Sequence, residues 1–134
     1  MKKLIVSLGL VLTLSFGATF NEGVEAFEKG DYKTALSIFE DLSSTNNSEA
    51  QYYLGFLYYN GQGVKQDYKK AKEWFEKAAA QGNTLAQNNL GLMYYHGEGV
   101  KQDFKKAKEW FGKACDGGEQ MGCDNYKKLN QKGY

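Results

Sequence analysis

The sequence contains no arginine and no proline, and among its 134 residues it has one histidine and two cysteines. Phosphate backbones are bound by an excess of positive charge, and arginine gives the bidentate contacts, whereas this chain is nearly neutral. We therefore expect no nucleic acid partner. A single histidine is also too few for a zinc hydrolase, and we expect no metal and no cofactor. Strand-like alternation of apolar and polar residues is missing, so the predicted fold is all-α.

The longest apolar run lies at the N-terminus, from Leu4 to Leu14, and follows two lysines. A membrane helix needs about 20 apolar residues, so this run is too short to be one. Basic residues, a short apolar stretch and then small residues are typical of a signal peptide. We predict a signal peptide over residues 1–18, cleaved between residues 15 and 19, and a periplasmic or secreted protein with no stable membrane insertion after cleavage. An uncleaved anchor is the alternative.

A repeat of 36 residues organises the rest of the chain. Several segments recur at this offset: Ala50–Gly55 as Ala86–Gly91, Gly63–Asp67 as Gly99–Asp103, and Ala71–Phe75 as Ala107–Phe111. The offset also carries Asp67 back to Asp31, so a related repeat with a shorter loop precedes these two. We predict one domain over residues 19–134, with repeats at about 20–47, 48–83 and 84–119 and a cap at 120–134.

Each repeat carries the signals of two helices, which we call helix A and helix B. One such pair cannot bury its apolar face alone, so successive pairs must stack into a continuous core. The sequence thus predicts an α/α solenoid (superhelix) of about three helix-turn-helix repeats with a C-terminal capping helix. Leu54, Tyr58 and Trp74 are expected to fill the core. The expected cap residues are Ser48 with Gln51 and Thr84 with Gln87 as capping boxes, Gly61 and Gly97 as left-handed C-caps, and Asp31, Asp67 and Asp103 as N-caps.

These repeats resemble the Sel1-like repeat family, a relative of the tetratricopeptide repeats. The resemblance rests on alanine and Leu-Gly in helix A, tyrosine near its end, Gly-x-Gly-Val in the loop, and alanine, tryptophan and Ala-Ala in helix B. It covers Glu22 to about Lys128. The resemblance implies an α/α superhelix that usually serves as a protein-interaction scaffold.

The two cysteines, Cys115 and Cys123, flank the predicted turn between the last helix B and the cap. In an oxidising compartment, thiols held across so short a turn are expected to form a disulfide, with a redox pair or free thiols as alternatives. The Cys-x7-Cys spacing also resembles the exported cysteine-rich Sel1-like proteins of Helicobacter, in which each repeat carries such a bridge. This chain departs from them at the other two junctions, which have Ala79 with Gln87, and Ser43 with Gln51.

That second resemblance implies a hydrolase as the alternative function, because those proteins have been linked with penicillin binding and β-lactamase activity. Serine β-lactamases use Ser-x-x-Lys, and the serines of the repeats lack it. His96 ends a helix A and is interpreted as an exposed turn residue. The glycine loops Gly61–Gly63 and Gly97–Gly99 lack the Gly-Lys-Ser/Thr of a phosphate loop and are interpreted as turns. We therefore assign no catalytic residue.

A second aromatic face on helix A is the remaining functional candidate. Its side chains follow helical spacing, opposite the face that is expected to enter the core. In related repeats this face is concave and lined for ligands, and aromatic anchors suit a peptide, a protein or a cell-wall fragment. The alternative is that a short array packs these side chains against its own ends. The predicted binding residues are Tyr52, Phe56, Tyr59, Asn88, Leu92 and Tyr95.

Overall fold

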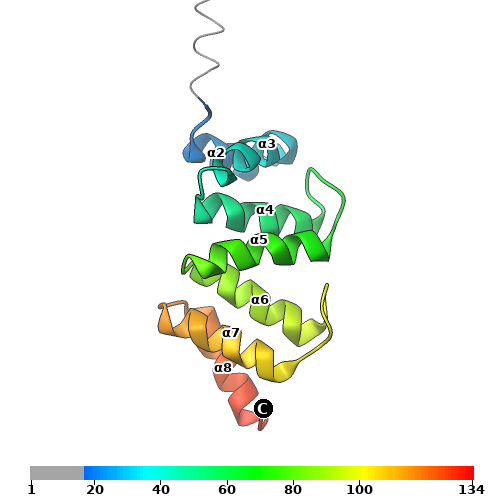
Figure 1. The fold of residues 1–134 in the computed structure, drawn as a ribbon, viewed down its shortest axis with the longest axis vertical. Helices are drawn as coiled ribbons and strands as arrows, with labels where there is room; N and C mark the ends of the chain where they lie inside the picture. The colour runs from blue at the N-terminus through cyan, green and yellow to red at the C-terminus, as the bar shows by residue number, and fades with distance from the viewer. Residues whose placement is uncertain (1–16) are drawn as a thin grey trace, which may run out of the picture.

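The computed structural model describes residues 17–134, and the predicted signal peptide, apart from its last two residues, lies outside this range. The described part consists of helices and contains no strand, and the helices stack one after another along the long axis (Figure 1). The all-α solenoid is therefore confirmed. The helices are α2 (Phe20–Glu28), α3 (Tyr32–Ser43), α4 (Ser48–Asn60), α5 (Tyr68–Ala80), α6 (Thr84–His96), α7 (Phe104–Asp116) and α8 (Gln120–Gln131).

Helices α2, α4, α6 and α8 are the A helices, and α3, α5 and α7 are the B helices. Each A helix packs against the B helix that follows it, and α8 packs on α7 as the cap. Consecutive A helices touch directly from α4 to α6 and from α6 to α8, so their side chains form one face of the stack. No helix within residues 17–134 combines the length and the apolar content needed to cross a membrane.

The B helices begin at the three predicted aspartates. The carboxylates of Asp31, Asp67 and Asp103 accept hydrogen bonds from backbone amides three residues later, at 3.3, 3.1 and 3.0 Å. The predicted C-caps Gly61 and Gly97 adopt left-handed φ values of 65° and 71°, which glycine reaches without a Cβ penalty. These local signals place the helix ends where the sequence indicated.

The N-caps of α4 and α6 differ from the prediction. Asn47 and Asn83 cap these helices, and their side-chain oxygens accept from the amides of Ala50 and Ala86, each at 2.9 Å. Ser48 and Thr84 are the first helical residues instead. The predicted capping boxes were therefore wrong by one position, because two neighbouring residues could each cap a helix and the asparagine has the extended backbone that the cap requires.

In each repeat, a glycine on helix A faces a phenylalanine on helix B. A Cβ added at Gly55 would lie 2.6 Å from ring atoms of Phe75, and Gly91 faces Phe111 in the same way. The absent side chain lets the two helices approach until the ring is buried, and Phe75 is 1% exposed. Gly23 and Phe39 repeat the contact in the first unit, so the two helices of each repeat approach one another in the same way.

The two tryptophans are less buried than the neighbouring phenylalanines, although Trp74 packs against two neighbouring core clusters and so fills the space between them as predicted. Trp74 and Trp110 are half-buried, and the lysines one turn later, Lys77 and Lys113, lie over their rings at 4.4 and 4.5 Å from the centroids. A tryptophan next to a buried phenylalanine points about 100° away around the helix. Leu54 and Tyr58 are buried as predicted.

Candidate functional site

The face made by the A helices carries two adjoining hollows, which we call the A-helix groove. The first lies between α4 and α6, encloses about 190 Å³ and is lined by Phe56, Tyr59, Asn60, Asn89 and Leu92. The second lies between α6 and α8 and encloses about 230 Å³. Its lining residues are Leu92, Tyr95, His96, Phe111, Asn125, Lys128, Leu129 and Lys132. Leu92 lines both hollows, so they form one continuous surface.

Four of the six predicted binding residues lie in this groove. Phe56, Tyr59, Leu92 and Tyr95 are all half-buried, each with part of its side chain open to solvent. They come from equivalent positions of α4 and α6, as the helical spacing indicated. Their inner edges contact other rings of the chain, with centroid distances of 5.7 Å from Phe56 to Phe27, 5.2 Å from Tyr59 to Tyr68 and 5.3 Å from Tyr95 to Phe104.

Asn88 does not belong to the groove surface and is a correction to the prediction. Its side chain is 2% exposed, and its Oδ1 accepts a hydrogen bond from Asn125 Nδ2 at 3.2 Å. Burial of a polar amide requires such a partner, and here the partner ties α6 to the cap. Asn89, the next residue, lines the first hollow instead. The 36-residue offset makes Asn88 equivalent to Tyr52, but the smaller polar side chain of Asn88 can turn inward between α6 and α8.

The hydroxyl of Tyr59 is held by a specific partner. It donates a hydrogen bond to Oε2 of Glu98, which follows α6 in the next repeat. Burial raises the pKa of Tyr59 above its ordinary value, and the hydrogen bond and negative charge of Glu98 raise it further. The phenol thus stays protonated and links two repeats. This fixes the ring at the rim of the first hollow.

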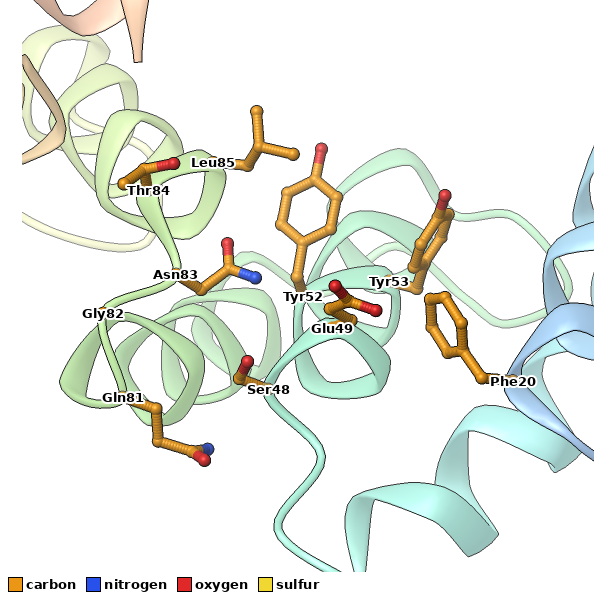
Figure 2. Close-up of a pocket in the computed structure, with 10 residues that line it drawn as sticks. All are labelled: Phe20, Ser48, Glu49, Tyr52, Tyr53, Gln81, Gly82, Asn83, Thr84 and Leu85. Carbon is orange, nitrogen blue, oxygen red and sulfur yellow. The ribbon is translucent and has the colours of Figure 1, made fainter. Parts of the chain in front are cut away.

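Tyr52 lies in a separate pocket at the N-terminal ends of α4 and α6. This pocket encloses about 500 Å³, and Figure 2 shows Tyr52 beside Leu85 of α6, with Tyr53 and Phe20 on its other side. The ring centroids of Tyr52 and Tyr53 are 5.5 Å apart. Burial raises the pKa of the Tyr52 hydroxyl above its ordinary value. Tyr52 is therefore near the A-helix groove but lines a different hollow.

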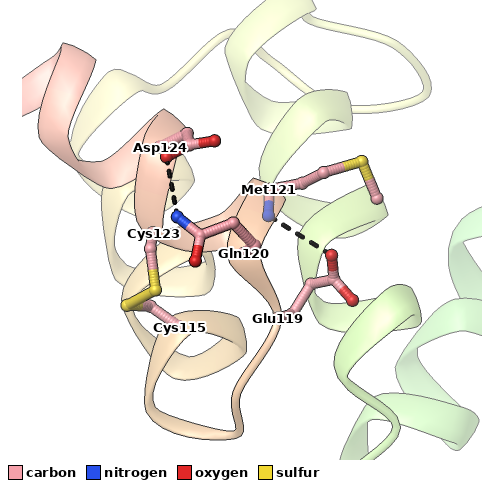
Figure 3. The surroundings of a disulfide bond; sticks show 6 residues. All are labelled: Cys115, Glu119, Gln120, Met121, Cys123 and Asp124. Atoms are coloured by element: carbon pink, nitrogen blue, oxygen red, sulfur yellow. Dashed lines mark hydrogen bonds between the residues drawn. A yellow bond between two sulfur atoms is a disulfide. The ribbon is translucent and has the colours of Figure 1, made fainter.

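A disulfide joins Cys115, near the end of α7, to Cys123 in the first turns of α8 (Figure 3). The preceding junction uses a weaker tie at the equivalent positions. There Gln87 Nε2 donates to the carbonyl oxygen of Ala79 at 3.3 Å. The covalent link therefore fixes α8, which supplies one wall of the second hollow.

The histidine and the loop glycines that were considered for catalysis or phosphate binding lie at helix ends and turns. His96 is exposed at the end of α6, and its ring lies 5.0 Å from that of Tyr95. The loop glycines Gly63 and Gly99 have φ values of 71° and 69° and pack on the start of the preceding helix B, at Tyr32 and Tyr68. Within residues 17–134, no three His, Cys, Asp or Glu side chains gather to hold a metal ion.

Comparison with known proteins places the chain among helical repeat proteins. The Sel1 repeat model matches residues 48–83 and 84–119, which together exceed half of the chain. No curated protein matches it. A Sel1 repeat protein from Oxalobacter formigenes is 30% identical, with a TM-score of 0.82, over 86% of this chain and 47% of that one.

Two further solved structures are similar. A protective antigen of uropathogenic Escherichia coli strains, which displays an SLR fold, is 34% identical over 84% of this chain and 25% of its own, with a TM-score of 0.79. Cysteine rich protein B of Helicobacter pylori is 30% identical over 68% of each chain, with a TM-score of 0.64. The present chain thus spans about half the length of the Oxalobacter protein and a quarter of the antigen. The chain belongs to the Sel1 repeat family, whose repeats typically serve as protein-interaction scaffolds.

Proposed function

We propose that this protein is an exported, non-enzymatic scaffold that binds a peptide or an extended segment of another protein in the A-helix groove. The observation that carries the proposal is the set of half-buried apolar side chains at Phe56, Tyr59, Leu92 and Tyr95, which line two joined hollows. Apolar surface left in contact with water is stabilised when a ligand covers it, by about 25 cal/mol per Å². Aromatic side chains in such a pocket dominate binding energy. A cell-wall fragment is a second ligand that this surface could accept.

The groove is well prepared for a ligand because its walls are fixed before binding. The ring of Tyr59 is held through Glu98, and the carbonyl oxygens of Tyr59 and Tyr95 accept from Gln66 and Gln102 at 2.8 and 2.9 Å. These contacts tie the ends of α4 and α6 to the loops that follow them. A preformed site avoids the cost of ordering side chains when the ligand binds.

Export is supported by two separate observations. The N-terminal pattern predicts a signal peptide, and disulfides such as Cys115–Cys123 persist in oxidising compartments. Similarity to the cysteine rich protein B of Helicobacter pylori agrees with this location. These observations support a location in the periplasm or outside the cell.

The proposal is tested by selecting peptides on the purified, oxidised protein and measuring their affinity by fluorescence anisotropy. Leu92→Ala should weaken binding by roughly 1–3 kcal/mol, because Leu92 lines both hollows. Tyr126→Ala is the matched control, since Tyr126 is 39% exposed and lies outside the groove. Circular dichroism must show that both variants remain folded. Equal affinity of Leu92→Ala and wild type would contradict the proposed site.

A further inference from the structure

The side chains that line the A-helix groove change from aromatic to basic along the stack of helices. Phe56 of α4, Leu92 of α6 and Lys128 of α8 are separated by one repeat length each and occupy equivalent helix positions. A second row at the same spacing runs from Asn60 through His96 to Lys132. Both rows end in lysine, at Lys128 within α8 and at Lys132, its C-cap. The groove therefore runs from an aromatic hollow to a basic one.

The second hollow holds positive charge without a matching carboxylate. Lys128 and Lys132 line it together with His96, and no Asp or Glu is among its lining residues. Lys132 Nζ donates to the Tyr95 hydroxyl at 3.4 Å, and neither lysine joins either of the salt bridges found in residues 17–134. In contrast, Tyr59 at the first hollow already has a carboxylate partner, because its hydroxyl donates to Glu98. The chain as a whole is nearly neutral, so this local excess of charge is a property of the site.

We propose that the groove binds an extended peptide with an acidic side chain, which sits at Lys128 and Lys132 while an apolar side chain fills the hollow at Phe56 and Leu92. The inference rests on the proposed peptide-binding function and adds the chemistry of the ligand to it. A carboxylate there would gain two charge-assisted hydrogen bonds from the exposed ammonium groups of Lys128 and Lys132. Opposite charges across an interface also set the direction in which the peptide lies.

The geometry of the stack sets the spacing within the peptide. Packed helices lie about 8–10 Å apart, and the two hollows are related by one step between A helices. A chain in the polyproline II conformation advances about 3.1 Å per residue with three residues per turn, so an acidic residue about three positions from the apolar one lies about 9 Å away on the same side of the peptide. A fixed spacing in the selected peptides would distinguish binding along the groove from non-specific attraction of acidic peptides to lysines.

The test uses a random peptide library fused through its C-terminus to a display carrier, so that only side-chain carboxylates are offered. Peptides are selected on wild type, on Lys128→Gln/Lys132→Gln and on the control Lys65→Gln/Lys101→Gln. The control removes the same charge from equivalent exposed loop positions outside the groove. Wild type and control should enrich Asp or Glu about three residues from an aromatic or aliphatic residue, whereas the groove variant should keep the apolar preference alone.

One enriched peptide and its amide counterpart, with Glu replaced by Gln or Asp by Asn, are then measured in solution. The acidic form should bind wild type about tenfold more tightly than the amide form, a difference that two partly exposed ion pairs can supply. Added salt and the Lys128→Gln/Lys132→Gln variant should each remove most of this difference. Enriched peptides that need Leu92 but show no acidic preference would overturn the assignment and leave the proposed function standing. Failure to enrich any peptide would overturn both.

Discussion

Replacing Phe75 by alanine should destabilise the protein far more than replacing its neighbour Trp74. Phe75 is 1% exposed, and its ring fills the space that Gly55 leaves between α4 and α5. Removal of a fully buried ring costs about 3–5 kcal/mol, and the close packing against a helix backbone places this site near the upper end. Trp74 is half-buried and keeps Lys77 over its ring, so its loss should cost about 2 kcal/mol.

The two variants are compared by urea unfolding followed by far-UV circular dichroism. A typical domain has a free energy of unfolding of about 5–15 kcal/mol, so Phe75→Ala should lose a large share of its stability. Trp74→Ala should retain a cooperative transition at a modestly lower urea concentration. If Trp74→Ala loses as much stability as Phe75→Ala, the glycine-phenylalanine contact is not the main contribution to the packing of helix A on helix B.

Three further predictions concern the ends and contacts of the helices. Cys115→Ser/Cys123→Ser should lower the free energy of unfolding by about 2.5 kcal/mol, because the bridge closes a loop with a sequence separation of 8. Hydrogen exchange should show that α8 opens first in this variant, and unchanged exchange in α8 would argue against the prediction. Asn83→Ala should cost about 1 kcal/mol and Thr84→Ala less than about 0.5 kcal/mol in urea unfolding, and the reverse order would restore the threonine as the cap of α6. Gly55→Ala should destabilise the protein by about 1–2 kcal/mol, because the new methyl group would lie 2.6 Å from the buried ring of Phe75. This clash outweighs the better helix propensity of alanine, and a higher melting temperature of the variant would show that the ring can move.

The parts of the fold that sequence could predict are those fixed by local chemistry. Asp67 caps α5 and Gly61 ends α4 because each residue type satisfies helix-end groups without distant partners. The choice between Asn83 and Thr84 was not local, since both side chains can cap and only the backbone path decides. That Phe75 is buried more deeply than Trp74 also depends on tertiary packing. The signal in the sequence that could have indicated it is the helix A glycine that recurs with a helix B phenylalanine in every repeat.

The groove was predictable where helical spacing governs it. Tyr59 and Leu92 lie where periodicity placed them, because a regular helix maps sequence spacing onto one face. Asn88 turned inward through its hydrogen bond to Asn125, a contact between residues of separate repeats. The lysines of α8 escaped notice because the cap departs from the repeat pattern, although the 36-residue offset links Lys128 to Leu92.

A nuclear magnetic resonance titration of the oxidised protein with a peptide selected on wild type would locate the binding surface directly. We expect the largest chemical-shift changes along α4, α6 and α8, at Tyr59, Leu92, Tyr95 and Lys128, with little change around Trp74. Changes confined to α5, α7 or their loops would contradict this expectation, because the ligand would then bind the B-helix face and the A-helix groove would not be the binding site.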